Sequence, residues 1–363
     1  MLQSHIGLQR LRSQHITQDK FETPEDVVGW MGAMQAQDYL QAVWAVGVRT
    51  QRGLLADVEQ ALETGRIIRT WPMRGTIHFI LPQEARWRLM LSAARMIAAD
   101  QRRLHQLDLS VEIMAQCEAV FRAALEGGKR LTRSQMLDLL EHNGISAAKQ
   151  RGYHILWYTA QIGVICLGPM EDKQQTFTLL DNWVQEDLTR EEALGTLARR
   201  YFTSHGPATV HDLAWWAGIT VTDARSGLEM VKTEFITEEV DGKTYWMHAS
   251  ANGINPDDDS ARVMLLPGFD EYFLGYKDRG AIISDEHMQK VVPGNNGVFK
   301  PMLVVDGEVV GLWQRTVKKK AVEVTLLPFN TLGAYEAEAV EAAQGYAAFH
   351  GLPLVVKGAS RPG

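Results

Sequence analysis

The sequence predicts an α+β fold of three tandem winged helix-turn-helix units followed by a small C-terminal β-barrel domain. Two observations lead to this prediction. One short pattern occurs three times: a threonine, an acidic or amide residue three positions later, and apolar residues at helical spacing. After about residue 260, the chain changes to short β-rich runs divided by turns. We therefore expect winged-helix units at 1–108, 109–188 and 189–255, and the β-barrel domain at 256–363.

Each copy of the pattern has the signals of a helix beginning. The copies are TPEDVVGWMGAM, TRSQMLDLLEHNGI and TVHDLAWWAGIT, which begin at Thr23, Thr132 and Thr209. Each threonine is expected to be a helix N-cap, and the capping partners three residues later are Asp26, Gln135 and Asp212. Pro24 suits the first helical position, and Gly144 and Gly218 are placed to end the second and third helices. The first helix is expected to run from Pro24 to about Met34.

A β-rich run follows each pair of amphipathic segments. The runs are IIRTWPMRGTIHFI, GVICLGPMEDKQQTFTLL and FITEEVDGKTYWMHA. A single copy fits an ordinary helical hairpin capped by two strands equally well, but three copies in the same order favour winged helices. The third copy is the clearest, because Asp241-Gly242 is a strong hairpin signal.

The C-terminal part combines strands with one helix. LVVDGEVVGLW predicts a β-hairpin, and YEAEAVEAAQGYAAFHG predicts a helix near the end of the chain. The stretch ANGINPDDDS, residues 251–260, is the expected linker to this domain.

Composition limits the class of protein. The chain has 363 residues, of which 45% are hydrophobic and 22% charged, so it can bury substantial cores. No apolar run approaches the ~20 residues that cross a bilayer, and the N-terminus has no apolar secretory core. These features predict a cytoplasmic protein without a membrane partner. Cys117 and Cys166 lack metal-ligand spacing, which predicts reduced, buried thiols and no metal site.

The charge is unevenly distributed. The net charge is −7, and residues 191–260 alone carry twelve acidic against five basic residues. This balance excludes a wholly basic nucleic-acid binder but leaves room for a basic groove elsewhere. Phosphate-loop and dinucleotide-binding motifs are missing, so no cofactor is expected. His78, His205 and His350 are interpreted as structural residues, and at least one of Trp215 and Trp216 as part of the core.

Two glutamines interrupt an apolar stretch in the first unit. Gln35 and Gln37 lie within WMGAMQAQDYLQAVWAVG, at the expected end of the first helix. In a nonhelical segment, residues two positions apart can point the same way, so both amides could face one cavity. The alternative is that they satisfy the end of the helix, and spacing alone favours this alternative.

Five segments, taken together, resemble a known family. GAMQAQDYLQA, RTWPMRGTIHFI, SHGPATVHDLAWWAGI, LLPGFDEYFLGYKDR and NNGVFKPMLVVDGEVVG occur in the order found in the AlkZ-like winged-helix DNA glycosylases. The resemblance extends from about residue 5 to about residue 355. It implies three tandem winged helices with a C-terminal β-barrel, and a catalytic Gln-x-Gln motif that Gln35 and Gln37 match. Asp38 is a possible assisting residue.

The resemblance implies hydrolysis of the N-glycosidic bond of cationic N-alkylated purines, including possible unhooking of interstrand crosslinks. Such a base leaves readily, so the two neutral amides need only position water and tolerate a cationic sugar. The expected partner is double-stranded DNA carrying these lesions, bound by a monomer in an open channel. The candidate phosphate contacts are Arg69, Arg74, Lys277, Arg279, Asn295, Asn296, Arg315 and Lys318.

Each of these contacts also has a structural interpretation. Arg74 could be a buried salt-bridge partner, Asn295 and Asn296 could serve only their turn, and Lys318 to Lys320 could form a solvated strand edge.

Two other functions of the protein remain open at this stage. A noncatalytic winged-helix regulator is the main alternative, although the acidic third unit and the lack of a heptad repeat weigh against it. A protein-binding scaffold would leave Gln35 and Gln37 unexplained.

Overall fold

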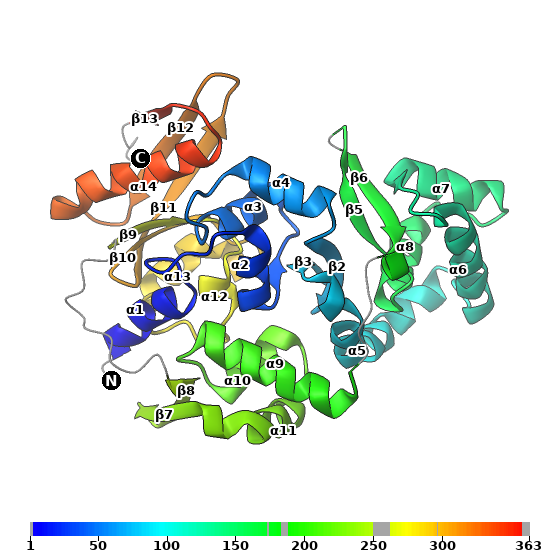
Figure 1. Ribbon diagram of the computed structural model, residues 1–363, viewed down its shortest axis with the longest axis horizontal. Coiled ribbons are helices and arrows are strands. Elements are labelled where there is room, and N and C mark those ends of the chain that lie inside the picture. The colour runs from blue at the N-terminus through cyan, green and yellow to red at the C-terminus, as the bar shows by residue number, and fades with distance from the viewer. Residues whose placement is uncertain (1–2, 173, 183–187, 250–261, 296, 358–363) are drawn as a thin grey trace.

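A computed structural model describes residues 3–172, 174–182, 188–249, 262–295 and 297–357. Within these ranges the chain is a mixed α+β structure in which helices α1 to α14 surround three β-sheets (Figure 1). Helices α6 to α8 lie on one side of the hairpins β2–β3 and β5–β6, and the C-terminal sheet lies on the other (Figure 1). The expected linker at 251–260 lies outside the described residues.

The N-terminal segment begins with helices and ends in a hairpin. Its elements are α1 (Gln3–Ser13), α2 (Pro24–Met31), β1 (Met34–Gln35), α3 (Tyr39–Gly47), α4 (Leu55–Glu63), β2 (Ile68–Met73), β3 (Thr76–Ile80) and the long α5 (Ala85–Gln106). Thr23 caps α2 by accepting from the Asp26 amide, and Pro24 is its first residue, as predicted. The predicted end at Met34 is wrong, because Gly32 adopts φ 76° and its amide bonds to Val28.

The second segment repeats the order of helices and strands that runs from α2 to β3. It contains α6 (Val111–Leu125), β4 (Leu131–Thr132), α7 (Arg133–His142), α8 (Arg151–Gln161), β5 (Ile165–Glu171) and β6 (Gln174–Leu179). The predicted capping box of Thr132 and Gln135 is confirmed, and Gly144 follows the end of α7 with φ 75°. Strands β2 and β5 pair at Arg69 and Leu167, which joins the first two hairpins in one six-stranded sheet.

The third segment contains α9 (Arg190–His205), α10 (Val210–Ala217), α11 (Val221–Val231), β7 (Phe235–Val240) and β8 (Lys243–His248). Thr209 and Asp212 form the predicted capping box, and Gly218 ends α10 in the left-handed conformation. The hairpin predicted at Asp241-Gly242 is β7–β8, and it forms a separate two-stranded sheet.

The C-terminal domain is an open sheet, so the predicted β-barrel is wrong. Its elements are β9 (Val263–Leu266), α12 (Glu271–Leu274), α13 (Asp285–Val291), β10 (Met302–Val305), β11 (Glu308–Val317), β12 (Val322–Pro328), α14 (Glu336–Phe349) and β13 (Leu354–Lys357). The strand order is β13-β12-β11-β10-β9, and the two end strands do not pair with each other among the described residues. Helix α14, which was predicted, contacts β9, β12 and β13. The helix packs on the open sheet, whereas in a barrel the two end strands would pair with each other.

One hydrophobic core joins the two ends of the chain. It combines buried side chains between Leu11 and Phe79 with buried side chains between Val263 and Phe349. A second core joins α9 to α11 with parts of the first segment, and a third joins α5 to β6 with Trp71 of β2. The packing therefore crosses the boundary predicted at residue 108, and the division into four units stays a prediction.

Three smaller predictions concern buried residues. Trp216 is fully buried and Trp215 only partly so, which confirms that at least one of this pair belongs to the core. Cys117 and Cys166 are buried and unpaired, and burial raises the pKa of the Cys166 thiol to about 12. Among the described residues, no helix is long and apolar enough to span a membrane.

Candidate active site

The Gln-Ala-Gln segment is a strand rather than a helix end. Met34 and Gln35 form β1, which pairs antiparallel with Phe79 and His78 of β3. The Ala36 amide extends this pairing by donating to the Ile77 carbonyl at 2.7 Å. Since α2 already ends at Met31, the two glutamines do not cap it, so the interpretation as a helix end does not hold.

The two glutamine side chains lie along one side of this segment. Met34 and Ala36 are fully buried, whereas Gln35 is 7% exposed and Gln37 is exposed. This alternation places Gln35 and Gln37 on the same face of an extended chain. Gln35 Oε1 accepts from the Gln37 amide at 3.3 Å, and Gln37 Oε1 accepts from the Ile77 amide at a long 3.5 Å. The amide oxygens therefore stay close to the backbone, with Gln37 open to solvent.

His78 is opposite Gln35 and is held neutral. It is fully buried, and burial first, then the charge of Arg74, lowers the pKa of its imidazole to about 3. Arg74 Nη2 lies 3.4 Å from His78 Nε2, and His78 Nδ1 lies 2.9 Å from the Thr76 carbonyl. Because a guanidinium only donates, Nε2 accepts and Nδ1 carries the proton. His78 is thus structural, as predicted, and is a neutral neighbour of the segment at physiological pH.

Glu271 lies behind Gln35, at the start of α12. It is 1% exposed, and its Oε1 accepts from the Gln35 amide at 2.9 Å. Its Oε2 accepts from Trp216 Nε1 at 2.8 Å and lies 3.8 Å from His205 Nε2. Burial alone would raise the pKa of this carboxyl, but the facing His205 ring and the Arg74 guanidinium lower it to about 2. Glu271 is therefore an ionised group sealed against solvent.

Asp38 follows the segment and caps the next helix. Its exposed carboxylate accepts from the Gln41 amide at 3.3 Å at the beginning of α3. Arg315 of β11 contacts Tyr346, whose pKa is raised by burial first and lowered in part by the Arg315 charge. The Arg315 guanidinium also lies 5.8 Å from the Tyr346 ring centroid. Asp38 is thus engaged at the beginning of α3, and Arg315 lies against Tyr346.

Arg69 holds the middle of the segment from within the protein. It is 5% exposed, donates to the Ala36 carbonyl at 3.3 Å, and donates a second bond to Gln175 of β6. Its guanidinium lies 5.2 Å from the Tyr39 ring centroid, and burial lowers its pKa to about 10. This placement suits a structural clamp better than the phosphate contact predicted for it.

Arg74 and Arg279 share one tryptophan. Their guanidinium carbons lie 4.8 and 5.0 Å from the Trp215 ring centroid, and Arg279 also donates to the Phe273 carbonyl at 2.8 Å. Burial lowers the pKa of both, that of Arg279 to about 10. Arg74 Nε and Arg279 Nη2 are buried without a hydrogen-bond partner. Arg74 contacts His78 rather than a carboxylate, so the salt-bridge interpretation does not hold for it.

The remaining predicted contacts belong to the C-terminal part of the chain. Lys277 is exposed, with its backbone amide bonded to Asp212. Lys318 is exposed beyond the end of β11 and bonds to Glu323 at 2.5 Å. Asn295 ends a short 3-10 turn, Pro293–Asn295, but its side chain is not described, and Asn296 lies outside the described residues.

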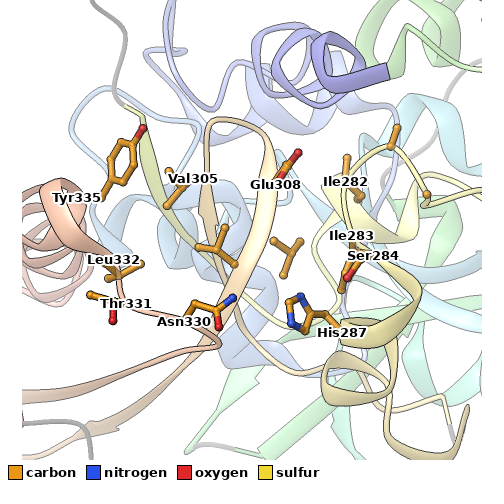
Figure 2. Close-up of a pocket in the computed structure, with 14 residues that line it drawn as sticks. Ile282, Ile283, Ser284, His287, Val305, Glu308, Asn330, Thr331, Leu332 and Tyr335 are labelled. Atoms are coloured by element: carbon orange, nitrogen blue, oxygen red, sulfur yellow. The ribbon is translucent and has the colours of Figure 1, made fainter. Parts of the chain in front are cut away.

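A separate cavity of about 470 Å³ lies beside the C-terminal sheet (Figure 2). Ser284, His287, Glu308 and Tyr335 surround it together with apolar side chains from the segment before α13 and from β10 and β11. None of the predicted site residues lines it. The candidate site is instead the solvent-facing side of the β1 segment, around Gln37.

Comparison with known proteins identifies the family of this chain. A sequence profile described as "DNA glycosylase AlkZ-like" matches residues 28–349, a range that includes Gln35 and Gln37. The chain belongs to the AlkZ-like DNA glycosylase family. It is 25% identical over 355 residues to an "Interstrand DNA cross-link repair glycosylase" of Streptomyces sahachiroi, covering 92% of both chains. The structure of the Streptomyces sahachiroi DNA glycosylase AlkZ matches with a TM-score of 0.80 and 24% identity, covering 98% of this chain and 99% of that one.

The protein is thus an enzyme, a DNA glycosylase, which selects the catalytic alternative over the regulator and the scaffold. Sequence reasoning about this AlkZ-like glycosylase missed Glu271 as a neighbour of the glutamines. The signal was present, because two acidic residues in the otherwise apolar LLPGFDEYFLGY are unusual for a buried segment. Burial of acidic residues requires partners, but the sequence did not show that Gln35 is one of them.

Proposed function

We propose that this glycosylase hydrolyses the N-glycosidic bond of cationic N-alkylated purines in double-stranded DNA, using water positioned by Gln35 and Gln37. The observation that carries the proposal is the character of the groups around these amides. His78 is neutral and buried, and Glu271 is sealed behind the backbone of Gln35. Asp38 is engaged as the cap of α3.

Such a site is poorly equipped to protonate a leaving base. A purine alkylated on a ring nitrogen already carries a positive charge, so its departure needs no general acid. What the protein must supply is a water molecule below the anomeric carbon and a polar environment for a cationic sugar. The long contact between Gln37 Oε1 and the Ile77 amide is the one that a bound water would replace most easily. Gln37 is therefore the better placed of the two to hold the water.

The substrate range follows from the exposure of the site. Gln37 is exposed, and the described cavity near α13 does not include it. An open site can accept a bulky base, and the similar protein from Streptomyces sahachiroi is named as a crosslink repair glycosylase. Unhooking of interstrand crosslinks is accordingly part of the proposal, alongside the release of simple N-alkylpurines.

DNA binding is proposed to use cations at the protein surface, with the enzyme acting as a monomer. Lys277 and Lys318 are exposed and Arg315 is half-buried, whereas Arg69 is buried. We also propose that the three helix-and-hairpin segments are winged-helix units, since three helices precede each hairpin when the first unit is counted from α2.

The test is base release from a duplex that carries one 7-methylguanine, beside a nitrogen-mustard crosslinked duplex. Gln37→Ala is expected to slow single-turnover release by about 100-fold or more while duplex binding persists. Gln60→Ala, on the exposed side of α4, is the matched control and should release base at the wild-type rate. Equal rates for Gln37→Ala and Gln60→Ala would refute the role of the motif.

A further inference from the structure

Three separate parts of the chain meet at the carboxylate of Glu271. Glu271 belongs to the C-terminal domain, Trp216 and His205 to the third segment, and Gln35 to the first. The pairing with Gln35 spans 236 positions in sequence. The group that fixes the backbone of the glutamine motif is therefore supplied from outside the unit that contains the motif.

An ionised carboxylate satisfies both partners. The Gln35 amide and Trp216 Nε1 can only donate, and each is directed at a different oxygen of Glu271. A carboxamide would place its NH2 group, which cannot accept, at one of these two donors. Hydrogen bonds to a charged acceptor are also shorter and stronger than neutral ones, which limits movement of the Gln35 backbone.

The anchor acts on both glutamines. Gln35 receives the Glu271 bond at its amide, and its side-chain Oε1 accepts from the Gln37 amide at 3.3 Å. Displacement of Gln35 would therefore displace the backbone of Gln37 as well. Because a shift of about 1 Å at a reacting centre can cost ~100-fold in rate, such a displacement would be visible in catalysis.

We infer that Glu271 is a positioning residue, whose buried carboxylate holds Gln35 and, through it, Gln37 in the geometry needed for base release. The inference rests on the proposed function of the two glutamines. Glu271 is 1% exposed and so does not contact DNA itself. Its effect is on the rate of the chemical step and not on affinity for the duplex.

The adjacent residue provides a matched control. Asp270 is also fully buried and ionically bonded, but to Arg49, with oxygen–nitrogen distances of 2.8 and 2.9 Å. Asp270→Asn and Glu271→Gln are both isosteric, and both remove one buried charge from the same turn. Each also replaces one accepting oxygen by an NH2 group that faces a hydrogen-bond donor. Of the two variants, only Glu271→Gln alters the side chain that accepts from the Gln35 amide.

The experiment compares wild type, Glu271→Gln and Asp270→Asn in three measurements. These are single-turnover release of 7-methylguanine from a duplex, affinity for the same duplex, and hydrogen exchange of the Gln35 amide followed by NMR. Glu271→Gln is expected to slow release at least about 10-fold more than Asp270→Asn, with unchanged affinity and faster exchange at Gln35. Asp270→Asn should leave exchange at Gln35 unchanged.

Equal release rates for the two variants would overturn the inference while leaving the proposed function intact. Failure of the wild type to release any alkylated base would instead refute the proposed function. The role of Glu271 is then tested only by hydrogen exchange of the Gln35 amide. A Gln35 amide that exchanges in the wild type as fast as an exposed amide would overturn the inference. If a variant does not fold, the inference is tested by hydrogen exchange of the Gln35 amide in the wild type.

Discussion

Arg69 could stabilise the fold as a buried residue or contact a DNA phosphate as a cation, and one variant can distinguish these two roles. Its guanidinium is 5% exposed and donates to Gln175 and to the Ala36 carbonyl. Hydrogen bonds to a charged group contribute ~1.5–3 kcal/mol each, and loss of the buried charge also removes its desolvation cost. We expect Arg69→Met to lower the free energy of unfolding by about 2–4 kcal/mol, measured by urea denaturation.

The same variant should leave the salt dependence of DNA binding unchanged. Each phosphate contact that is lost reduces the slope of log K against log salt by about 0.9. Lys277→Ala, which removes an exposed cation, is expected to reduce the slope by about that amount without destabilising the fold. A slope for Arg69→Met that falls as much as for Lys277→Ala would show that Arg69 contacts phosphate and that the argument from burial is wrong.

Three further predictions concern stability. Asp270→Ala leaves the fully buried Arg49 without its acidic partner and should cost about 3–5 kcal/mol in urea denaturation; a cost below about 1 kcal/mol would contradict this. Burial lowers the pKa of His78 to about 3, so the unfolded chain binds the extra proton below pH 6.5 and stability falls as pH decreases. Between pH 6.5 and 5, His78→Gln should reduce this loss by up to about 1.4 kcal/mol per pH unit, and an unchanged slope would refute it. A Cβ on Gly268 would lie 2.2 Å from the Phe299 carbonyl oxygen, so Gly268→Ala should lower the midpoint of thermal unfolding, whereas Gly345→Ala, in open space on α14, should raise it. The same shift in both glycine variants would contradict the packing described.

Local signals in the sequence predicted local structure well. The caps at Thr23, Thr132 and Thr209 depend on residues three positions apart, and all three are present. The hairpins at Asp241-Gly242 and Asp306-Gly307 were also found, because these dipeptides accept the positive φ that tight turns require.

Longer-range features were not accessible in the same way. The open C-terminal sheet depends on where α14 packs, and strand patterns alone do not distinguish an open sheet from a barrel. Gln35 and Gln37 were recognised from a family resemblance, and spacing by itself favoured a helix end. The bond between Gln35 and Glu271 left no local trace, since neither residue has a neighbour in sequence that indicates the other.

The core shared by the two ends of the chain has a consequence for synthesis. Side chains between Leu11 and Phe79 are covered by side chains that follow Val263, and the Gln35 amide finds its acceptor only at Glu271. A nascent chain on the ribosome thus exposes an unfinished apolar surface while most of the protein is being translated. The N-terminal segment cannot reach its described geometry before the C-terminal domain has emerged. A messenger RNA truncated before the codon for Glu271 would yield a chain that contains Gln35 and Gln37 but lacks the carboxylate that holds the Gln35 amide.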